Sequence, residues 1–319
     1  MATGEDRQSG LRLVPLGGEG PEHVTGDGTG GLLTGVADGR ILGVDPDTGR
    51  VHTVADTGGR PLGLLLGRDG DLLVCDAEKG LLRVDLASGK ATPLLTTVQG
   101  RPLGVCSNVA QDRDGVLYVT DASSRYGLAE WKRDLLEHIG SGRLIRLSPD
   151  GTADVLLDGL RFANGVALSP DGSHVVVAET GTRRLHRVWL SGARAGRHDV
   201  LTDALPGYPD NLTVTADGLI WVAVAGPPDV LLEAVHRAPA VVRRRAAALP
   251  PKLLPDPRPS VRALALDFSG RRIHDVRFPA RGFRMVTSAY SADGRLFLGS
   301  LRGTFLAVTP LPAGASNGT

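Results

Sequence analysis

The sequence predicts an all-β protein, a six-bladed β-propeller with two short helical insertions on the face that carries its candidate ligand residues. Three observations predict this fold. Short alternating apolar runs are joined by Asp-Gly turns, which favour hairpins. Glycine and proline are frequent, with 43 and 21 residues, as many tight turns require. A second hairpin follows most copies, so each copy has the four strands of a propeller blade.

The hairpin turns recur along the whole chain. The Asp-Gly pairs begin at residues 27, 69, 114, 171, 217 and 293. The basic spacing is 42 to 46 residues, and two insertions lengthen it. We expect one propeller over residues 11–312, with the N-terminal strand at Leu11–Leu16 completing the last blade. Residues 1–10 are predicted to be a disordered N-terminal tail, and residues 313–319 a C-terminal tail.

The two insertions are the segments with helical character. In Tyr126–Ile139, apolar residues recur at helical spacing beside charged residues. The second helical stretch lies within Val230–Leu249, is rich in arginine and ends in a proline-dense segment. Both insertions follow the second strand of their blade, which returns to the face where the inner strands begin. We therefore expect them to cover that face and to form a lid over a central pocket.

Oxygen-bearing side chains occur at one phase of the repeat. Reading about six residues back from each turn samples the top of each inner strand, where side chains point to the propeller axis. Four of the six copies have a carboxylate or carboxamide there, at Glu22, Asn108, Asn164 and Asp210-Asn211. Such a set suits a hard divalent cation, with Ca²⁺ favoured. The alternative is that these residues cap turns or satisfy backbone amides.

Composition excludes several classes of partner. The formal charge is +1, from 36 basic and 35 acidic residues, so we expect no nucleic acid and no membrane partner. Met1–Gly10 has no apolar run of a signal peptide, which favours a cytoplasmic protein. Cys75 and Cys106 lie in apolar stretches and are expected to be buried free thiols. No nucleotide-binding motif is present.

The sequence resembles a known superfamily of six-bladed propellers: gluconolactonases, senescence marker protein, paraoxonase-type lactonases and strictosidine synthase-like proteins. The resemblance covers nearly the whole chain and is closest to the strictosidine synthase-like branch. The segments that carry it include Gly59-Arg60-Pro61-Leu62-Gly63-Leu64, Tyr118-Val119-Thr120-Asp121, Phe162-Ala163-Asn164-Gly165-Val166 and Leu205-Pro206-Gly207-Tyr208-Pro209-Asp210-Asn211. The resemblance implies an axial divalent metal held by Glu22, Asn108, Asn164, Asp210 and Asn211.

One departure from the family decides between its branches. Strictosidine synthase condenses an amine with an aldehyde through a glutamate on the inner strand of the last blade, and the matching position here is Thr287. The chain also keeps the metal-type side chains that the plant enzyme has lost. Amine–aldehyde condensation is therefore disfavoured, and metal-assisted hydrolysis of an ester or lactone is favoured.

The predicted function is a Ca²⁺-dependent hydrolase of a small-molecule lactone or carboxylic ester. Asp210 is the preferred general base because the family's ligand aspartate is proposed to double in that role, and His23 is a second candidate. The substrate-binding candidates are Arg60, Asn108, Asp121, Tyr126, Trp131 and Glu179. For Asp121 and Glu179 the alternative, support of the ligands through hydrogen bonds, is favoured. Two alternatives stay open: a non-catalytic propeller that binds ligands or proteins around a structural metal, and a biosynthetic enzyme acting on a natural-product scaffold.

Overall fold

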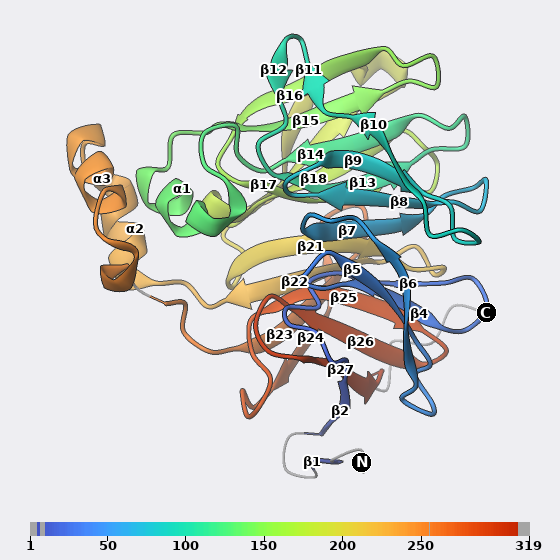
Figure 1. Cartoon of the computed structure of the whole chain (residues 1–319). Helices are drawn as coiled ribbons and strands as arrows, with labels where there is room; N and C mark the ends of the chain where they lie inside the picture. The colour runs from blue at the N-terminus through green and yellow to red at the C-terminus, as the bar shows by residue number, and fades with distance from the viewer. Residues whose placement is uncertain (1–4, 7–9, 255, 312–319) are drawn as a thin grey trace.

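The computed structural model describes residues 5–6, 10–254 and 256–311, and confirms the six-bladed propeller (Figure 1). The first blade comprises β3 (Val24–Gly26), β4 (Leu32–Gly35), β5 (Arg40–Val44) and β6 (Val51–Asp56). The second comprises β7 (Pro61–Leu66), β8 (Leu72–Asp76), β9 (Gly80–Val84) and β10 (Ala91–Leu95). The third comprises β13 (Cys106–Gln111), β14 (Leu117–Asp121), β15 (Gly142–Leu147) and β16 (Ala153–Leu160).

The remaining blades repeat this order from the axis outwards. The fourth comprises β17 (Ala163–Leu168), β18 (His174–Glu179), β19 (Arg184–Trp189) and β20 (His198–Thr202). The fifth comprises β21 (Tyr208–Val214), β22 (Ile220–Gly226), β23 (Val261–Leu266) and β24 (Arg272–Phe278). The sixth comprises β25 (Val286–Ala292), β26 (Arg295–Ser300) and β27 (Phe305–Pro310), with β2 (Leu11–Pro15) and β1 (Glu5–Asp6) outside them.

The N-terminal strand closes the ring, as expected. β2 pairs antiparallel with β27, with Arg12 opposite Val308. A short hairpin of β11 (Thr97–Val98) and β12 (Arg101–Pro102) links the second and third blades. Most of the predicted tail over residues 1–10, and all of residues 313–319, lie outside the described residues.

The hydrophobic core lies between neighbouring sheets. Leu33 and Ile41 of the first blade pack in one cluster with Leu64 and Val74 of the second. Each blade is covered by a neighbour on both faces, so second strands such as β8 and β22 are buried along their whole length. Cys75 and Cys106 are buried and free.

Three α-helices form a separate layer at one end of the propeller, with α1 between the blades and the outer pair (Figure 1). They are α1 (Trp131–Glu137), α2 (Val230–Arg237) and α3 (Ala240–Ala247). The 3₁₀ turns are η1 (Leu128–Glu130), η2 (Thr180–Thr182), η3 (Gly192–Arg194) and η4 (Pro251–Leu253). Pro239 divides the second insertion into two helices, because it forces Ala238 into an extended backbone. No helix in the described parts of the chain is long and apolar enough to cross a bilayer.

Candidate functional site

The inner strands bring the predicted ligand residues together at the propeller axis. Glu22 lies two residues before β3, Asn108 lies on β13, Asn164 on β17, and Asp210 and Asn211 on β21. All five are buried, with 8% exposure or less. Three of these strands have the same local irregularity. β13, β17 and β21 each pair irregularly with the neighbouring strand at the ligand position. Such bulges redirect side chains, here towards the axis.

Asn211 is the hub of the cluster's hydrogen bonds. Its Nδ2 donates to Glu22 Oε1 at 2.7 Å and lies 3.4 Å from Asp210 Oδ1. The same nitrogen donates to the Thr287 carbonyl at 2.8 Å, and Asn108 Nδ2 donates to Asn211 Oδ1 at 2.5 Å. One amide nitrogen therefore lies beside both carboxylates.

The hydrogen bonds that the two carboxylates accept come from amide groups and not from a charged side chain. Burial raises the pKa of Glu22 to about 7, against the opposing effects of Arg60 and of the Asn211 hydrogen bond. Burial, followed by the charge of Glu22, raises the pKa of Asp210 well above its usual range. Glu22 Oε2 is buried and has no hydrogen-bond partner. Two carboxylates, one with an unpartnered oxygen, beside amide groups fit a hard divalent cation.

The cluster depends on amides as well as acids. Among the residues that the structure describes, no three His, Cys, Asp or Glu side chains gather where they could hold a metal ion. Glu22 and Asp210 would therefore bind such an ion with amide oxygens, of which Asn164 Oδ1 accepts from Ser107 at 3.2 Å. The role of these residues as metal ligands stays a prediction.

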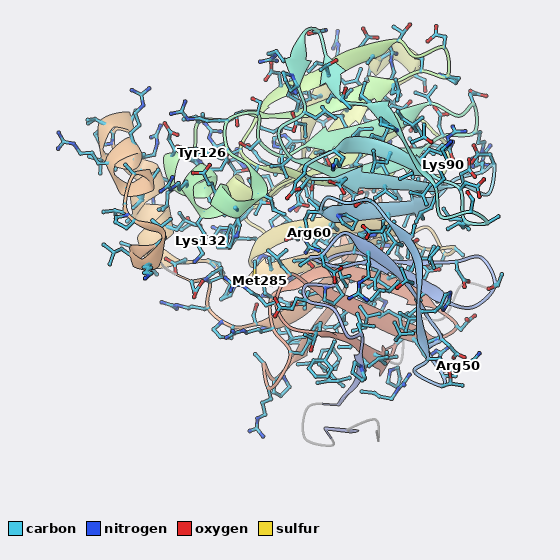
Figure 2. The ribbon with its side chains drawn as sticks, in the orientation of Figure 1. Arg50, Arg60, Lys90, Tyr126, Lys132 and Met285 are labelled. Atoms are coloured by element: carbon cyan, nitrogen blue, oxygen red, sulfur yellow. The ribbon has the colours of Figure 1, made fainter. Side chains whose placement is uncertain are left out.

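A deep pocket ends on the cluster. Glu22, Asn164, Asp210 and Thr287 line it, and it encloses about 1040 Å³ of empty space, its open mouth included. The apolar side chains around it come from the blades and from both insertions. They include Leu62, Val105, Leu128, Trp131, Leu135, Leu136, Phe162, Leu232, Met285 and Leu301. Figure 2 shows Met285 on the side of the propeller that faces the helices and Lys132 on α1 opposite it. The insertions thus cover the predicted ligand face.

Two apolar residues of the pocket wall have an unusual backbone. Phe162 directly precedes β17 and Met285 directly precedes β25, and their φ angles are 67° and 59°. Positive φ costs a non-glycine residue on the order of 1–2 kcal/mol. Both side chains line the pocket despite that cost, and such strain gathers at ligand sites.

Of three residues predicted to bind substrate, one lines the pocket and two lie away from it. Trp131 lines the pocket, as expected. Tyr126 does not, because its hydroxyl donates to Glu137 Oε2 at 2.5 Å within the first insertion. Arg60 is also buried away from the pocket wall, and its Nη2 donates to the Gly20 carbonyl at 2.8 Å.

The acidic residues that end second strands have structural contacts. Asp121 Oδ1 accepts from the amides of Gly104 and Val105, and its Oδ2 pairs with Arg143 at 2.6 Å. Glu179 accepts from the Arg161 amide and lies 2.8 Å from His186 Nε2. These carboxylates hold the segment before an inner strand and do not line the pocket, which agrees with a supporting role for Asp121 and Glu179 and not with contact to substrate.

A second cavity opens on the opposite face, and His23 and Asn108 line it instead of the pocket. His23 Nδ1 accepts from the Leu64 amide at 3.3 Å, and burial lowers the pKa of this histidine to about 4. The cluster separates the two cavities, so a base acting from the pocket would be Asp210 and not His23.

Four hydroxyl-bearing residues of the pocket are absent from the predictions: Ser107, Thr180, Tyr208 and Thr287. Three of them donate their proton within the protein. Ser107 donates to Asn164, Thr180 to the Pro209 carbonyl at 2.7 Å, and Thr287 to the Glu22 carbonyl at 2.6 Å. Ser107, Thr180 and Tyr208 lie within two residues of a ligand or of a second-strand end, and Thr287 lies at the ligand phase of the last inner strand. These positions are the signal that could have found them.

Comparison with known proteins gives the family. Residues 18–234 match the SMP-30/gluconolactonase/LRE-like family. The chain belongs to that family. Strictosidine synthase-like protein 10 of Arabidopsis thaliana is 34% identical, over 92% of this chain and 86% of its own length. Adipocyte plasma membrane-associated protein of Rattus norvegicus is 33% identical, over 90% of this chain and 82% of its own.

Solved structures of this SMP-30/gluconolactonase-like fold agree with the architecture. A gluconolactonase of Xanthomonas campestris has a TM-score of 0.68 at 20% identity, covering 95% of this chain and 89% of that one. A calcium-binding protein, regucalcin, of Agrobacterium tumefaciens has a TM-score of 0.64 at 17% identity, covering 94% and 93%. At these identities the structures establish the shared propeller fold.

Proposed function

We propose that the protein is a divalent-metal-dependent hydrolase, with Ca²⁺ as the favoured ion, of lactones or carboxylic esters with a large apolar part. The observation that carries this proposal is the pairing of Glu22 and Asp210 at the floor of a deep apolar pocket, with Glu22 Oε2 unpartnered. Buried acids of this kind, with raised pKa values, are typical of functional sites.

Glu22, Asp210 and Asn164 would hold the cation, and its contribution when bound is Lewis-acid polarisation of the acyl carbonyl. Asp210 accepts a proton from the attacking water as the general base. The water oxygen bonds to the acyl carbon, the bond from that carbon to the ester oxygen breaks, and the alcohol oxygen takes a proton. A lactone gives one hydroxy acid.

The pocket wall favours an apolar substrate over a sugar lactone. A polyol needs several donors and acceptors, whereas three of the four pocket hydroxyls named above already donate within the protein. Leu135 and Phe162 add buried apolar surface to the pocket wall.

The test is hydrolysis of δ-lactones that differ only in alkyl chain length, beside glucono-δ-lactone, after chelation and after Ca²⁺ is restored. We expect Ca²⁺-dependent turnover and a kcat/KM that rises by about fourfold per buried methylene, the equivalent of about 0.8 kcal/mol. If the protein hydrolyses none of these lactones but binds a matching alkyl lactam tightly, the non-catalytic ligand-binding propeller is favoured.

A further inference from the structure

The second insertion has an outer surface that the pocket does not use. Six of the ten large apolar residues that the structure describes as exposed lie between residues 230 and 253. They are Val230, Leu231, Val241, Val242, Leu249 and Leu253. Val230 is 75% exposed and Leu231 is 61% exposed, although both belong to a helix that packs on the protein. Together with the basic residues described next, they form what we call the outer helical face.

The inward sides of the same helices are already occupied. Leu232 and Val235 of α2 pack with Leu136 of α1 and Ala247 of α3 in one cluster. Figure 1 shows α2 and α3 as the outermost layer, with α1 between them and the blades. The exposed sides of α2 and α3 therefore face away from the propeller.

Positive charge is concentrated on this face. Arg237, Arg244, Arg245 and Lys252 are exposed, and Arg244 Nε also lies 3.6 Å from Glu137 Oε1 of α1. The one acidic residue between 230 and 253 is Glu233, and its carboxylate accepts from Arg183 Nε at 2.8 Å. The formal charge of +1 for the whole chain hides this local excess, and the expectation of no membrane partner used only the whole-chain value.

We propose that the outer helical face docks on an anionic lipid surface. Aliphatic side chains interleaved with arginines suit the boundary between headgroups and acyl chains, because the apolar groups enter while the long basic side chains reach the phosphates. A protein partner would need carboxylates matched to each buried arginine. The face also adjoins the pocket, since Leu232 on the other side of α2 lines it. This docking proposal does not rest on the proposed hydrolase activity.

The test is co-sedimentation of the full chain with vesicles of phosphatidylcholine alone and of phosphatidylcholine with phosphatidylglycerol. We expect binding to the anionic vesicles, weakened by high salt. Val241→Ser/Val242→Ser and Arg244→Ser/Arg245→Ser should each weaken binding on the order of tenfold.

Two matched controls make the test specific. Val200→Ser/Val214→Ser removes two valines of the blades that are 46% and 39% exposed, compared with 56% and 46% for Val241 and Val242. Arg50→Ser/Lys90→Ser removes two basic residues at the opposite end of the molecule (Figure 2). Both controls should bind as the parent does, and all variants should keep the parent's circular dichroism.

Three results would overturn the proposal. The first is no binding to anionic vesicles at low salt. The second is equal weakening of vesicle binding by the control variants, which would indicate non-specific binding of the protein to the vesicles. The third is a dimer in sedimentation equilibrium that Val241→Ser/Val242→Ser converts to a monomer, because the face would then belong to a second copy of the chain.

Discussion

Asp210 and Glu22 repel each other in a buried site, and this repulsion makes the metal prediction testable without an activity assay. Asp210→Asn removes one charge and keeps the side-chain volume. We expect the metal-free variant to melt a few degrees higher than the parent, because the cluster then holds a single carboxylate. We also expect it to lose the stabilisation that Ca²⁺ gives the parent through mass action.

The measurement is the melting temperature with chelator and with increasing Ca²⁺. Asp203→Asn, at an exposed aspartate, is the control and should keep the Ca²⁺ response. An Asp210→Asn variant that Ca²⁺ stabilises as much as the parent would remove Asp210 from the ligand set.

The sequence could predict which side chains meet at the axis, because the turn fixes the phase of each inner strand. It could not predict the partners of Tyr126 or Arg60. Tyr126 lies in an insertion whose orientation depends on Glu137, and Arg60 on a loop that reaches the Gly20 carbonyl. His23 follows Glu22 directly, and it opens on the opposite cavity, as alternation along a strand allows.

At the scale of elements, α1 is fastened to the third blade by a buried acid. Asp134 accepts from Ser123 Oγ at 2.5 Å and from Ser141 Oγ at 3.4 Å. Burial raises the pKa of Asp134 to about 6, and the charge of Glu137 adds to this while both serines and Arg125 oppose it. Ionised Asp134 therefore costs the folded state free energy.

The pH dependence follows from the direction of that shift. The unfolded chain releases this proton near pH 4, about 2 pH units below the folded one, so stability falls as pH rises from about 4 to about 6. Asp134→Asn keeps an acceptor for Ser123 and removes the charge. We expect it to raise the free energy of unfolding by about 3 kcal/mol near pH 8 and to leave it unchanged near pH 4. Urea unfolding at both pH values is the measurement, and an equal effect at both would contradict this.

The two sides of α2 give a prediction about specificity. Leu232 lines the pocket, whereas its neighbour Leu231 is exposed. Leu232→Gln should reduce kcat/KM for long alkyl lactones more than for short ones, by roughly tenfold for the longest, because it places a polar group on the apolar wall. Leu231→Gln is the matched control on the same helix. Equal losses on short and long lactones would indicate damage to folding or chemistry instead.

Sequence periodicity predicted the location of the helices but not which side of each helix packs on the protein. The second insertion reads as one segment over 230–249, and the proline at 239 divides it. The apolar pattern locates the helices, but residues on the inward and outward sides of α3 differ little in hydrophobicity, so which side packs is decided by Leu136 and Leu254 from other segments. Pocket-facing residues of the insertions, apart from Trp131, were therefore beyond prediction.

For the whole molecule, ring closure depends on one short strand. Val14 of β2 is buried in a cluster that joins the last blade to the first. Val14→Ala removes two methyl groups, and we expect a loss of about 2 kcal/mol in the free energy of unfolding with a single cooperative transition, because opening the ring exposes both neighbouring cores. Val51→Ala, on the half-buried outer strand β6, should cost less. Urea unfolding compares the two variants, and equal costs would show that closure adds nothing.

The pairing of β2 with β27 places Leu11 beside the end of β27, so the order of blades in the chain is cyclic. A gene rearranged to join residue 310 to residue 11 through a short linker, and reopened at the Asp217-Gly218 turn, would encode the same ring with new termini. The axial side chains would then arrive in a different order along the polypeptide but at the same places in space. Such a circular permutant would separate the contribution of blade order to folding from the contribution of the closed ring to the site.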